Sequence, residues 1–205
     1  DFFAAAHRIL NIETPVFKDG LFDKHGKWMD GWETRRKREK GHDYLILKLG
    51  RPGKIHKVDI DTSYFNGNQP SKISLDACYS KKKLPSKNLR WTNILKKSTT
   101  KPNSHHFFNI KNKSIFTHVK LNIYPDGGVA RIRIYGEMKI NKKFGKKITN
   151  LTSVLSGATP IACNNEHFGR AENILAPGMG KNMGDGWETR RSRGKNFDWL
   201  ILKCA

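Results

Sequence analysis

The sequence lacks the features of membrane-spanning and disulfide-stabilised proteins. No apolar run approaches the roughly 18 residues that a membrane helix needs, and the N-terminus has no basic-then-apolar signal pattern. Cys78, Cys163 and Cys204 are an odd number at wide spacings, which argues against a disulfide framework and a CxxC zinc site. We therefore expect a soluble, intracellular protein with reduced cysteines and no membrane partner, most simply in the cytoplasm, with the peroxisome left open.

Acidic residues are scarce. The chain has 39 Lys and Arg against 18 Asp and Glu, a net charge of +21, and residues 77–125 contain no acidic residue at all. Such a charge suggests a polyanion partner, but the basic residues are scattered singly, and no RNP-type, helix-turn-helix or finger pattern accompanies them. We expect generic electrostatic attraction and no specific nucleic-acid binding.

Common catalytic motifs are missing too. The sequence contains no HExxH, P-loop, GxSxG or paired CxxC pattern. Its 205 residues, 37% hydrophobic and 28% charged, suit one globular core plus part of another. Because it opens at Asp1 rather than Met and stops at Ala205 directly after an apolar run, we expect a fragment.

An internal repeat organises the chain. MDGWETRRKREKGHDYLILKL at 29–49 recurs as GDGWETRRSRGKNFDWLILKC at 184–204, an offset of 155 residues. A solenoid unit has a period of only roughly 20–50 residues, so each copy should be a domain. We predict a first repeat at 1–140, a Lys- and Gly-rich linker at 141–150, and the start of a truncated second repeat at 151–205.

Within the first copy the periodicity is mostly that of strands. Val119, Leu121 and Ile123 alternate with polar residues, and Leu45–Leu49 is a short apolar run typical of a strand buried on both faces. Only residues 3–10 suggest a helical turn. We predict strands at 45–49, 55–61, 73–78, 89–95, 105–110, 119–123 and 132–134, separated by turns at 51–53, 66–68 and 125–128. This pattern indicates an all-β antiparallel sandwich, of jelly-roll type.

The repeated segment also carries a family resemblance. GKWMDGWETRRKREKGHDYLILKLG at 26–50, followed by GKIHKVDIDTSYFNGNQP at 53–70, closely resembles the allantoicase family. The resemblance implies two similar galactose-binding-like jelly-roll domains and a hydrolase that cleaves allantoate to ureidoglycolate and urea in purine breakdown. One departure is Tyr44, which stands where the second copy has Trp199, so one aromatic residue replaces another.

Allantoate has one carboxylate and two ureido groups, so its site needs a guanidinium fork and acceptors for N–H groups. Arg35 or Arg36, with Arg38, is predicted to clamp the carboxylate, a task that lysine performs poorly. In the second copy we predict that Glu188, Arg190 and Arg191 bind substrate. Glu33 or Asp30 would accept from a ureido nitrogen or act as general base, and His42, or alternatively His56, would protonate the departing urea.

Structural interpretations stand beside these roles. Asp30-Gly31 suits a tight turn, Trp32 an apolar anchor, and Glu33 with Arg36, or Arg35 with Asp43, a loop-fixing ion pair. Asp59, Asp61 and Thr62 form a second polar cluster, for which we favour loop capping over a divalent cation. The adjacent His105 and His106 should point to opposite strand faces, so a shared metal is not predicted.

No metal ligand or cofactor is therefore predicted, although a divalent metal and a homo-oligomer remain open alternatives. The rival function is a non-catalytic β-sandwich binding module or an inactive homologue, because a fold alone does not determine function.

Overall fold

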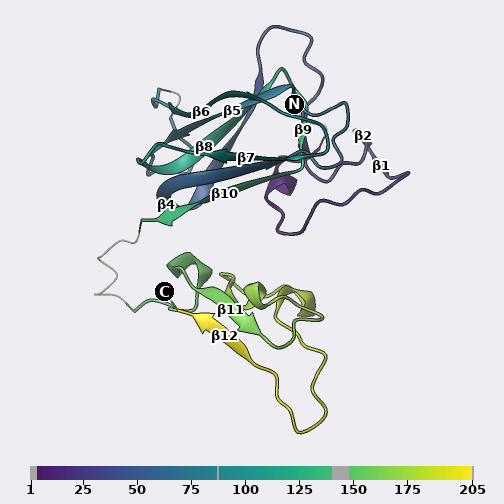
Figure 1. Cartoon of the computed structure of the whole chain (residues 1–205), viewed down its shortest axis with the longest axis vertical. Helices are drawn as coiled ribbons and strands as arrows, with labels where there is room; N and C mark the ends of the chain where they lie inside the picture. Colours follow the sequence, from purple (N-terminus) through teal and green to yellow (C-terminus); the bar gives the residue numbers. More distant parts are fainter. Residues whose placement is uncertain (1–3, 87, 140–147, 205) are drawn as a thin grey trace. The chain divides into compact units, whose positions relative to one another are not determined.

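The structure, a computed structural model, describes residues 4–86, 88–139 and 148–204. The chain divides into two compact units, residues 1–139 and 140–205 (Figure 1). Of the predicted linker, residues 141–147 lie outside the described residues. No helix in the described parts is long and apolar enough to span a bilayer.

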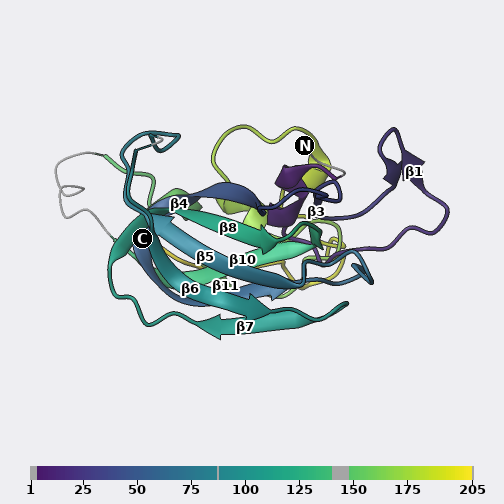
Figure 2. The same ribbon diagram turned by 90° about the horizontal axis from the view of Figure 1, so that it is seen from above.

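Apart from one short helix, the regular secondary structure described in the first unit consists of strands. They are β1 (Phe22–Asp23), β2 (Gly26–Lys27), β3 (Trp32–Glu33), β4 (Asp43–Asp61), β5 (Lys72–Cys78), β6 (Thr92–Thr99), β7 (His105–Asn109), β8 (Ile115–Tyr124), β9 (Gly128–Val129) and β10 (Arg131–Met138). The main sheet has the order β10-β4-β8-β5-β6, with β7 also paired to β4, and β8, β5 and β6 follow one another across it in Figure 2. Every strand pair is antiparallel, which confirms the predicted all-β class.

Strand β4 joins two groups of strands. Its first half pairs with β8, whereas residues 57–61 lie between β10 and β7. The predicted turn at 51–53 is wrong, because β4 continues through it and only its register against β8 shifts, between Lys48 and Gly53. A Cβ on Gly53 would lie 2.4 Å from the carbonyl oxygen of Glu137, so glycine allows the close approach of β10.

The core lies between the inward faces of these strands. Its fully buried members include Val58, Ile60, Ile73, Leu75, Val119, Leu121 and Ile123, with Trp32 and Ile9 beside them. The predicted burial of 45–49 on both faces is wrong, because only Leu47 is buried, and Tyr44 and Lys48 of the same strand are exposed. The predicted strand at 89–95 in fact begins at Thr92.

The described helices are all short 3-10 helices. In the first unit η1 (Ala6–Leu10) forms the predicted helical turn, of which Phe3 lies outside the described residues. The second unit contains η3 (Val154–Ser156), η4 (Ala171–Leu175), η5 (Met183–Asp185) and the antiparallel pair β11 (Thr159–Cys163) and β12 (Leu200–Lys203). Helix η4 stands 165 residues after η1, and the Ala4–Glu33 bridge has its counterpart in Gly169–Glu188. Helices η1 and η4, with the bridges beside them, are therefore equivalent local structures in the two units.

Candidate active site

Glu33 lies where three segments of the first unit meet. It ends β3, pairs with Gly128 of β9, and its Oε1 accepts a hydrogen bond of 2.9 Å from Asn68 Nδ2. Burial raises the pKa of Glu33 above its ordinary value, the Asn68 hydrogen bond opposes this, and the negative charge of Asp126 raises the pKa further. A half-buried carboxyl group with a raised pKa keeps its proton to higher pH than a solvated one, which suits it to proton transfer.

Two turns hold this carboxyl group in place. Thr34 N–H donates to the carbonyl of Gly127 at 3.0 Å, and Gly128 N–H donates to the carbonyl of Asn68 at 2.8 Å. Gly127 has a φ of +128°, and a Cβ there would lie 2.7 Å from the carbonyl oxygen of Asn68. The turns at 66–68 and 125–128 are therefore built into the site, and glycine is needed where they touch.

An arginine loop, residues 35–39, follows β3. Together with Asp43 it lines an open hollow of about 380 Å³. Lys37 fixes the loop twice, because its backbone N–H donates to Asp126 Oδ2 at 2.5 Å and its Nζ lies 3.0 Å from Asp43 Oδ1. These two contacts therefore fix the loop that lines the hollow.

The arginine side chains on this loop are exposed. The ion pairs considered from the sequence, Glu33 with Arg36 and Arg35 with Asp43, are absent from the described contacts, because Glu33 binds Asn68 and Asp43 binds Lys37. Exposed guanidinium groups can accept a carboxylate in bidentate geometry. The hollow is thus chemically suited to a small anion.

Asp30 is engaged elsewhere. Its Oδ2 lies 2.7 Å from Arg131 Nη2 in an ion pair whose side chains are 9% and 3% exposed, and it also accepts from Val16 N–H. Arg131 donates a further hydrogen bond to the Asp30 carbonyl. These contacts favour the structural interpretation of Asp30, as the burial of Trp32 in the core does for that residue. Arg131 gave no signal in the sequence beyond its place in a strand.

His42 belongs to a polar network on β8 and β5. Its Nε2 lies 3.3 Å from Asn122 Oδ1, and its ring packs 4.6 Å from that of Tyr124. Asn122 also donates to Asp76. Burial alone would raise the pKa of Asp76, but hydrogen bonds from Asn93 and Asn122, together with Lys120, outweigh burial and lower it. None of these contacts joins His42 to Glu33, so its predicted role as an acid stays a prediction.

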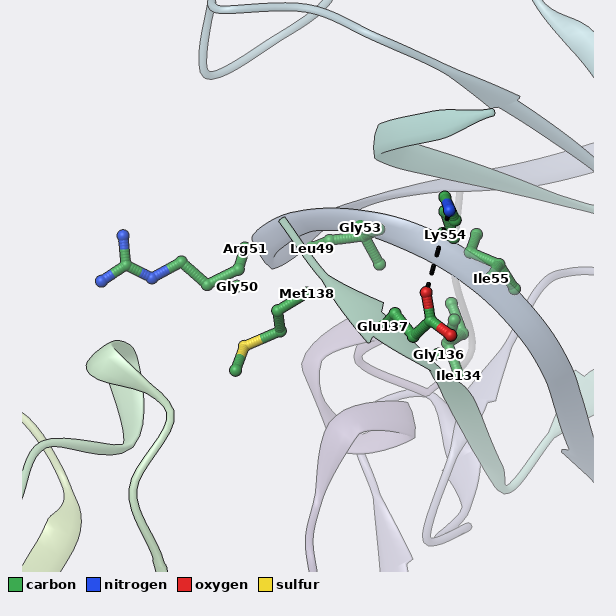
Figure 3. A pocket seen from close by; sticks show the side chains of 10 residues that line it. All are labelled: Leu49, Gly50, Arg51, Gly53, Lys54, Ile55, Ile134, Gly136, Glu137 and Met138. Atoms are coloured by element: carbon green, nitrogen blue, oxygen red, sulfur yellow. Dashed lines mark ion pairs between the residues drawn. The ribbon is translucent and has the colours of Figure 1, made fainter. Parts of the chain in front are cut away.

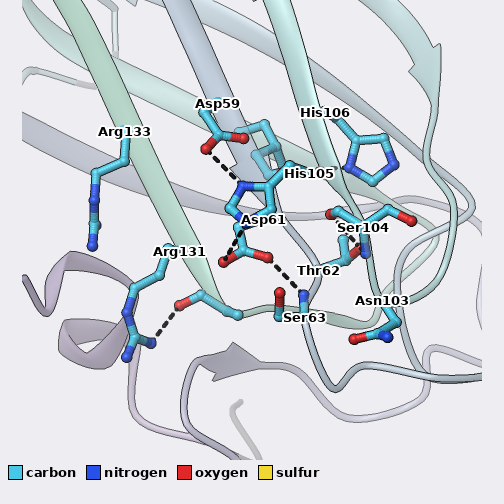
Figure 4. Close-up of polar contacts among 12 residues, drawn as sticks. Asp59, Asp61, Thr62, Ser63, Asn103, Ser104, His105, His106, Arg131 and Arg133 are labelled. Atoms are coloured by element: carbon cyan, nitrogen blue, oxygen red, sulfur yellow. Dashed lines mark hydrogen bonds and ion pairs between the residues drawn. The ribbon is translucent and has the colours of Figure 1, made fainter. Parts of the chain in front are cut away.

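A second cluster surrounds His105 (Figure 4). His105 Nδ1 lies 2.9 Å from Asp59 Oδ2 and its Nε2 lies 3.7 Å from Asp61 Oδ2, while the other Asp61 oxygen accepts from Ser63 N–H. The hydrogen bond to Asp59 is the main reason that the pKa of His105 is raised. Asp61 caps its loop as predicted, and within residues 4–86, 88–139 and 148–204 no three acidic, His or Cys side chains are arranged to hold a metal ion.

A smaller hollow of about 190 Å³ lies at the bend of β4 beside β10 (Figure 3). It is lined by Leu49, Gly50, Arg51, Gly53, Lys54, Ile55, Ile134, Gly136, Glu137 and Met138. Glu137 lies 3.9 Å from Lys54 and 3.2 Å from His56 Nε2. His56, the alternative acid, is therefore placed beside this hollow rather than among the described contacts of Glu33.

The second copy of the motif folds in its own unit. Glu188 is bridged to Gly169, and Trp187 Nε1 donates to the carbonyl of Asn165. The pKa of Asp198 is lowered by hydrogen bonds, first that from Thr189 and then those from Asn164 and Ser192. Arg190 and Arg191 are exposed, like their counterparts in the first unit.

Residues 1–139 and 149–205 match the family model described as the allantoicase repeat. Probable allantoicases from Acinetobacter baylyi and Photobacterium profundum are 50% and 48% identical to the chain; each alignment covers 98% of the chain, and 60% and 62% of the relatives. The crystal structure of allantoicase from Saccharomyces cerevisiae matches with a TM-score of 0.77 and 36% identity, covering 100% of this chain and 64% of that one. The chain thus spans about 60% of the length of these curated relatives.

Proposed function

This chain belongs to the allantoicase family, and we propose that the protein of which it forms part hydrolyses allantoate to ureidoglycolate and urea. The observation that carries this proposal is the arrangement around the first DGWETRR copy. A half-buried Glu33 with a raised pKa stands directly before a loop whose arginines line an open hollow.

The hollow is the proposed binding place of the substrate carboxylate. Arg35, Arg36 and Arg38 are exposed, and none of them forms an ion pair within the described residues. A planar guanidinium group offers two parallel N–H donors to a carboxylate, so it fixes the orientation of the substrate as well as its position. The oxygen of Glu33 that does not bind Asn68 is the proposed acceptor for a ureido N–H.

The reaction breaks the bond between the central carbon of allantoate and one ureido nitrogen. The hydroxyl group of water goes to that carbon, and the proton of water goes to the nitrogen that leaves as urea. We assign the transfer of this proton to Glu33, whose raised pKa suits a group that takes a proton and later returns it. Glu188, Arg190 and Arg191 are retained as substrate-binding candidates of the second unit.

Urea release from allantoate by the full-length protein tests the proposal, with Arg36→Lys as the variant. The lysine keeps the charge but loses the bidentate fork, so we expect KM to rise by about tenfold or more. Arg90→Lys, at an exposed position outside the hollow, is the matched control and should behave like the wild type.

The assay is run with and without added divalent metal ions, because we propose no cofactor. Absence of urea release from folded protein in both conditions would refute the enzymatic proposal and leave a binding module or an inactive homologue. We further propose an intracellular, reducing location, in keeping with three unpaired cysteines.

A further inference from the structure

We infer that Asp126 is a positioning residue of the Glu33 site, which ties the arginine loop to β3 and presents a second carboxylate to Glu33. This inference rests on the proposed function for its catalytic consequence. Asp126 lies in the Pro-Asp-Gly-Gly turn at 125–128, which by sequence alone is only a separator between strands.

The first part of the inference is mechanical. Asp126 Oδ2 accepts the backbone N–H of Lys37 at 2.5 Å, across 89 residues of sequence. A carboxylate that accepts from a backbone N–H forms a strong, charge-assisted hydrogen bond. Because the side chain of Lys37 is bound to Asp43, Asp126 supplies the complementary backbone anchor. Together the two acids determine where the loop leaves β3.

Asp126 itself has little freedom to move. The next residue, Gly127, accepts from Thr34 N–H at 3.0 Å and donates to Thr34 Oγ1 at 3.3 Å. Gly128 then pairs with Glu33 across β3 and β9. The carboxylate is therefore held by the same backbone ladder that positions Glu33, so a displacement of one would displace the other.

The second part is electrostatic. The groups that act on Glu33 are its own burial, the neutral amide of Asn68 on the 66–68 turn, and the charged Asp126 on the 125–128 turn. The ammonium group of Lys37, on the arginine loop, is paired with Asp43. A like charge disfavours the ionised form of a carboxyl group. The charge of Asp126 therefore favours the protonated form of Glu33.

Two substitutions in the full-length protein separate these parts. Asp126→Asn keeps an oxygen that can accept from Lys37 but removes the charge, so the limb of the kcat/KM profile that reports Glu33 should move to lower pH with little change in KM. Asp126→Ala also removes the anchor, so KM should rise by about tenfold and amide exchange in residues 35–39 should accelerate. Asp19→Asn, an exposed charge-matched control, should change neither.

A purely structural role for Asp126 would lower the stability of both variants and leave the pH profile in place, and that result would overturn the inference. If the wild-type protein releases no urea, the proposed function fails, and two readouts without turnover decide the inference. An NMR titration of the Glu33 carboxyl group should move to lower pH in Asp126→Asn, and exchange of the Lys37 amide should accelerate only in Asp126→Ala. If neither the titration nor the amide exchange differs from the wild type, the inference is refuted.

Discussion

The two copies of the repeated motif fix the same loop in different ways. In the first copy Asp43 pairs with the ammonium group of Lys37 at 3.0 Å. In the second copy the equivalent Asp198 accepts from the hydroxyl groups of Thr189 at 2.6 Å and Ser192 at 3.1 Å, and Ser192 is the counterpart of Lys37. The common element is an acceptor at the start of the following strand, whereas the donor can be charged or neutral.

The aspartate and the glutamate of the DGWETRR motif differ more in their surroundings. Asp30 forms a buried ion pair with Arg131, whereas its counterpart Asp185 is exposed and accepts from the backbone N–H of Lys181. In the first copy Glu33 has Asn68 and Asp126 beside it. The environment of both carboxyl groups of the first copy therefore comes from residues far away in the chain.

Removal of the Asp30 carboxylate should have the largest effect. Asp30→Ala leaves the Arg131 guanidinium buried without its counter-ion, so we expect the free energy of unfolding to fall by about 3 kcal/mol. Asp19→Ala, at an exposed position of the same unit, should change it by less than about 0.5 kcal/mol. Denaturant unfolding measures both, and equal losses would contradict the assignment of the stability to the buried ion pair.

The two glutamates should differ in kinetics. Glu33→Gln removes the proposed proton carrier, so kcat for urea release should fall by about 100-fold or more, with the fold preserved. Glu188→Gln should act chiefly by raising KM, because we assign Glu188 to substrate binding. If Glu188→Gln reduced kcat as strongly as Glu33→Gln, the proposed division of roles would be wrong.

His105 gives the first unit a pH dependence. Its folded-state pKa is raised, so the protonated form stabilises the fold below the unfolded-state pKa, and this contribution is lost as pH rises through the folded-state pKa. The stability difference between wild type and His105→Gln should therefore shrink as pH increases. The effect should be small because the side chain is 53% exposed. A difference that stays constant or grows with pH would contradict it.

Replacement of the loop contact of the first copy by that of the second should have the smallest effect. Lys37→Ser in the first unit copies the second, and the partly exposed ion pair that it removes is worth about 0.2–1 kcal/mol. The stability of wild type relative to Lys37→Ser should also decrease with added salt, which screens an exposed ion pair. Urea unfolding at low and high salt measures this, and a loss that is independent of salt would show that the ion pair is not its cause.

Local patterns in the sequence predicted most of the fold. Alternation at 119–123 identified β8, and the repeat offset marked two copies, because strand periodicity and repeated sequence are local properties. The errors fell where distant strands decide the outcome. Arg51-Pro52-Gly53 has the composition of a turn, yet pairing with β8 and β10 draws it into the continuous strand β4.

The sequence by itself therefore determined the all-β class, the family, and the arginine loop that follows Glu33, because these depend on residues adjacent in the chain. Only the tertiary structure decided what surrounds them. Asn68, Asp126 and Arg131 stand 35, 89 and 101 residues from Glu33, Lys37 and Asp30, respectively. In the sequence they are ordinary turn and strand residues. Their roles arise because antiparallel pairing brings these distant strand ends and turns together, where burial and neighbouring charge act on carboxyl groups that would otherwise be solvated.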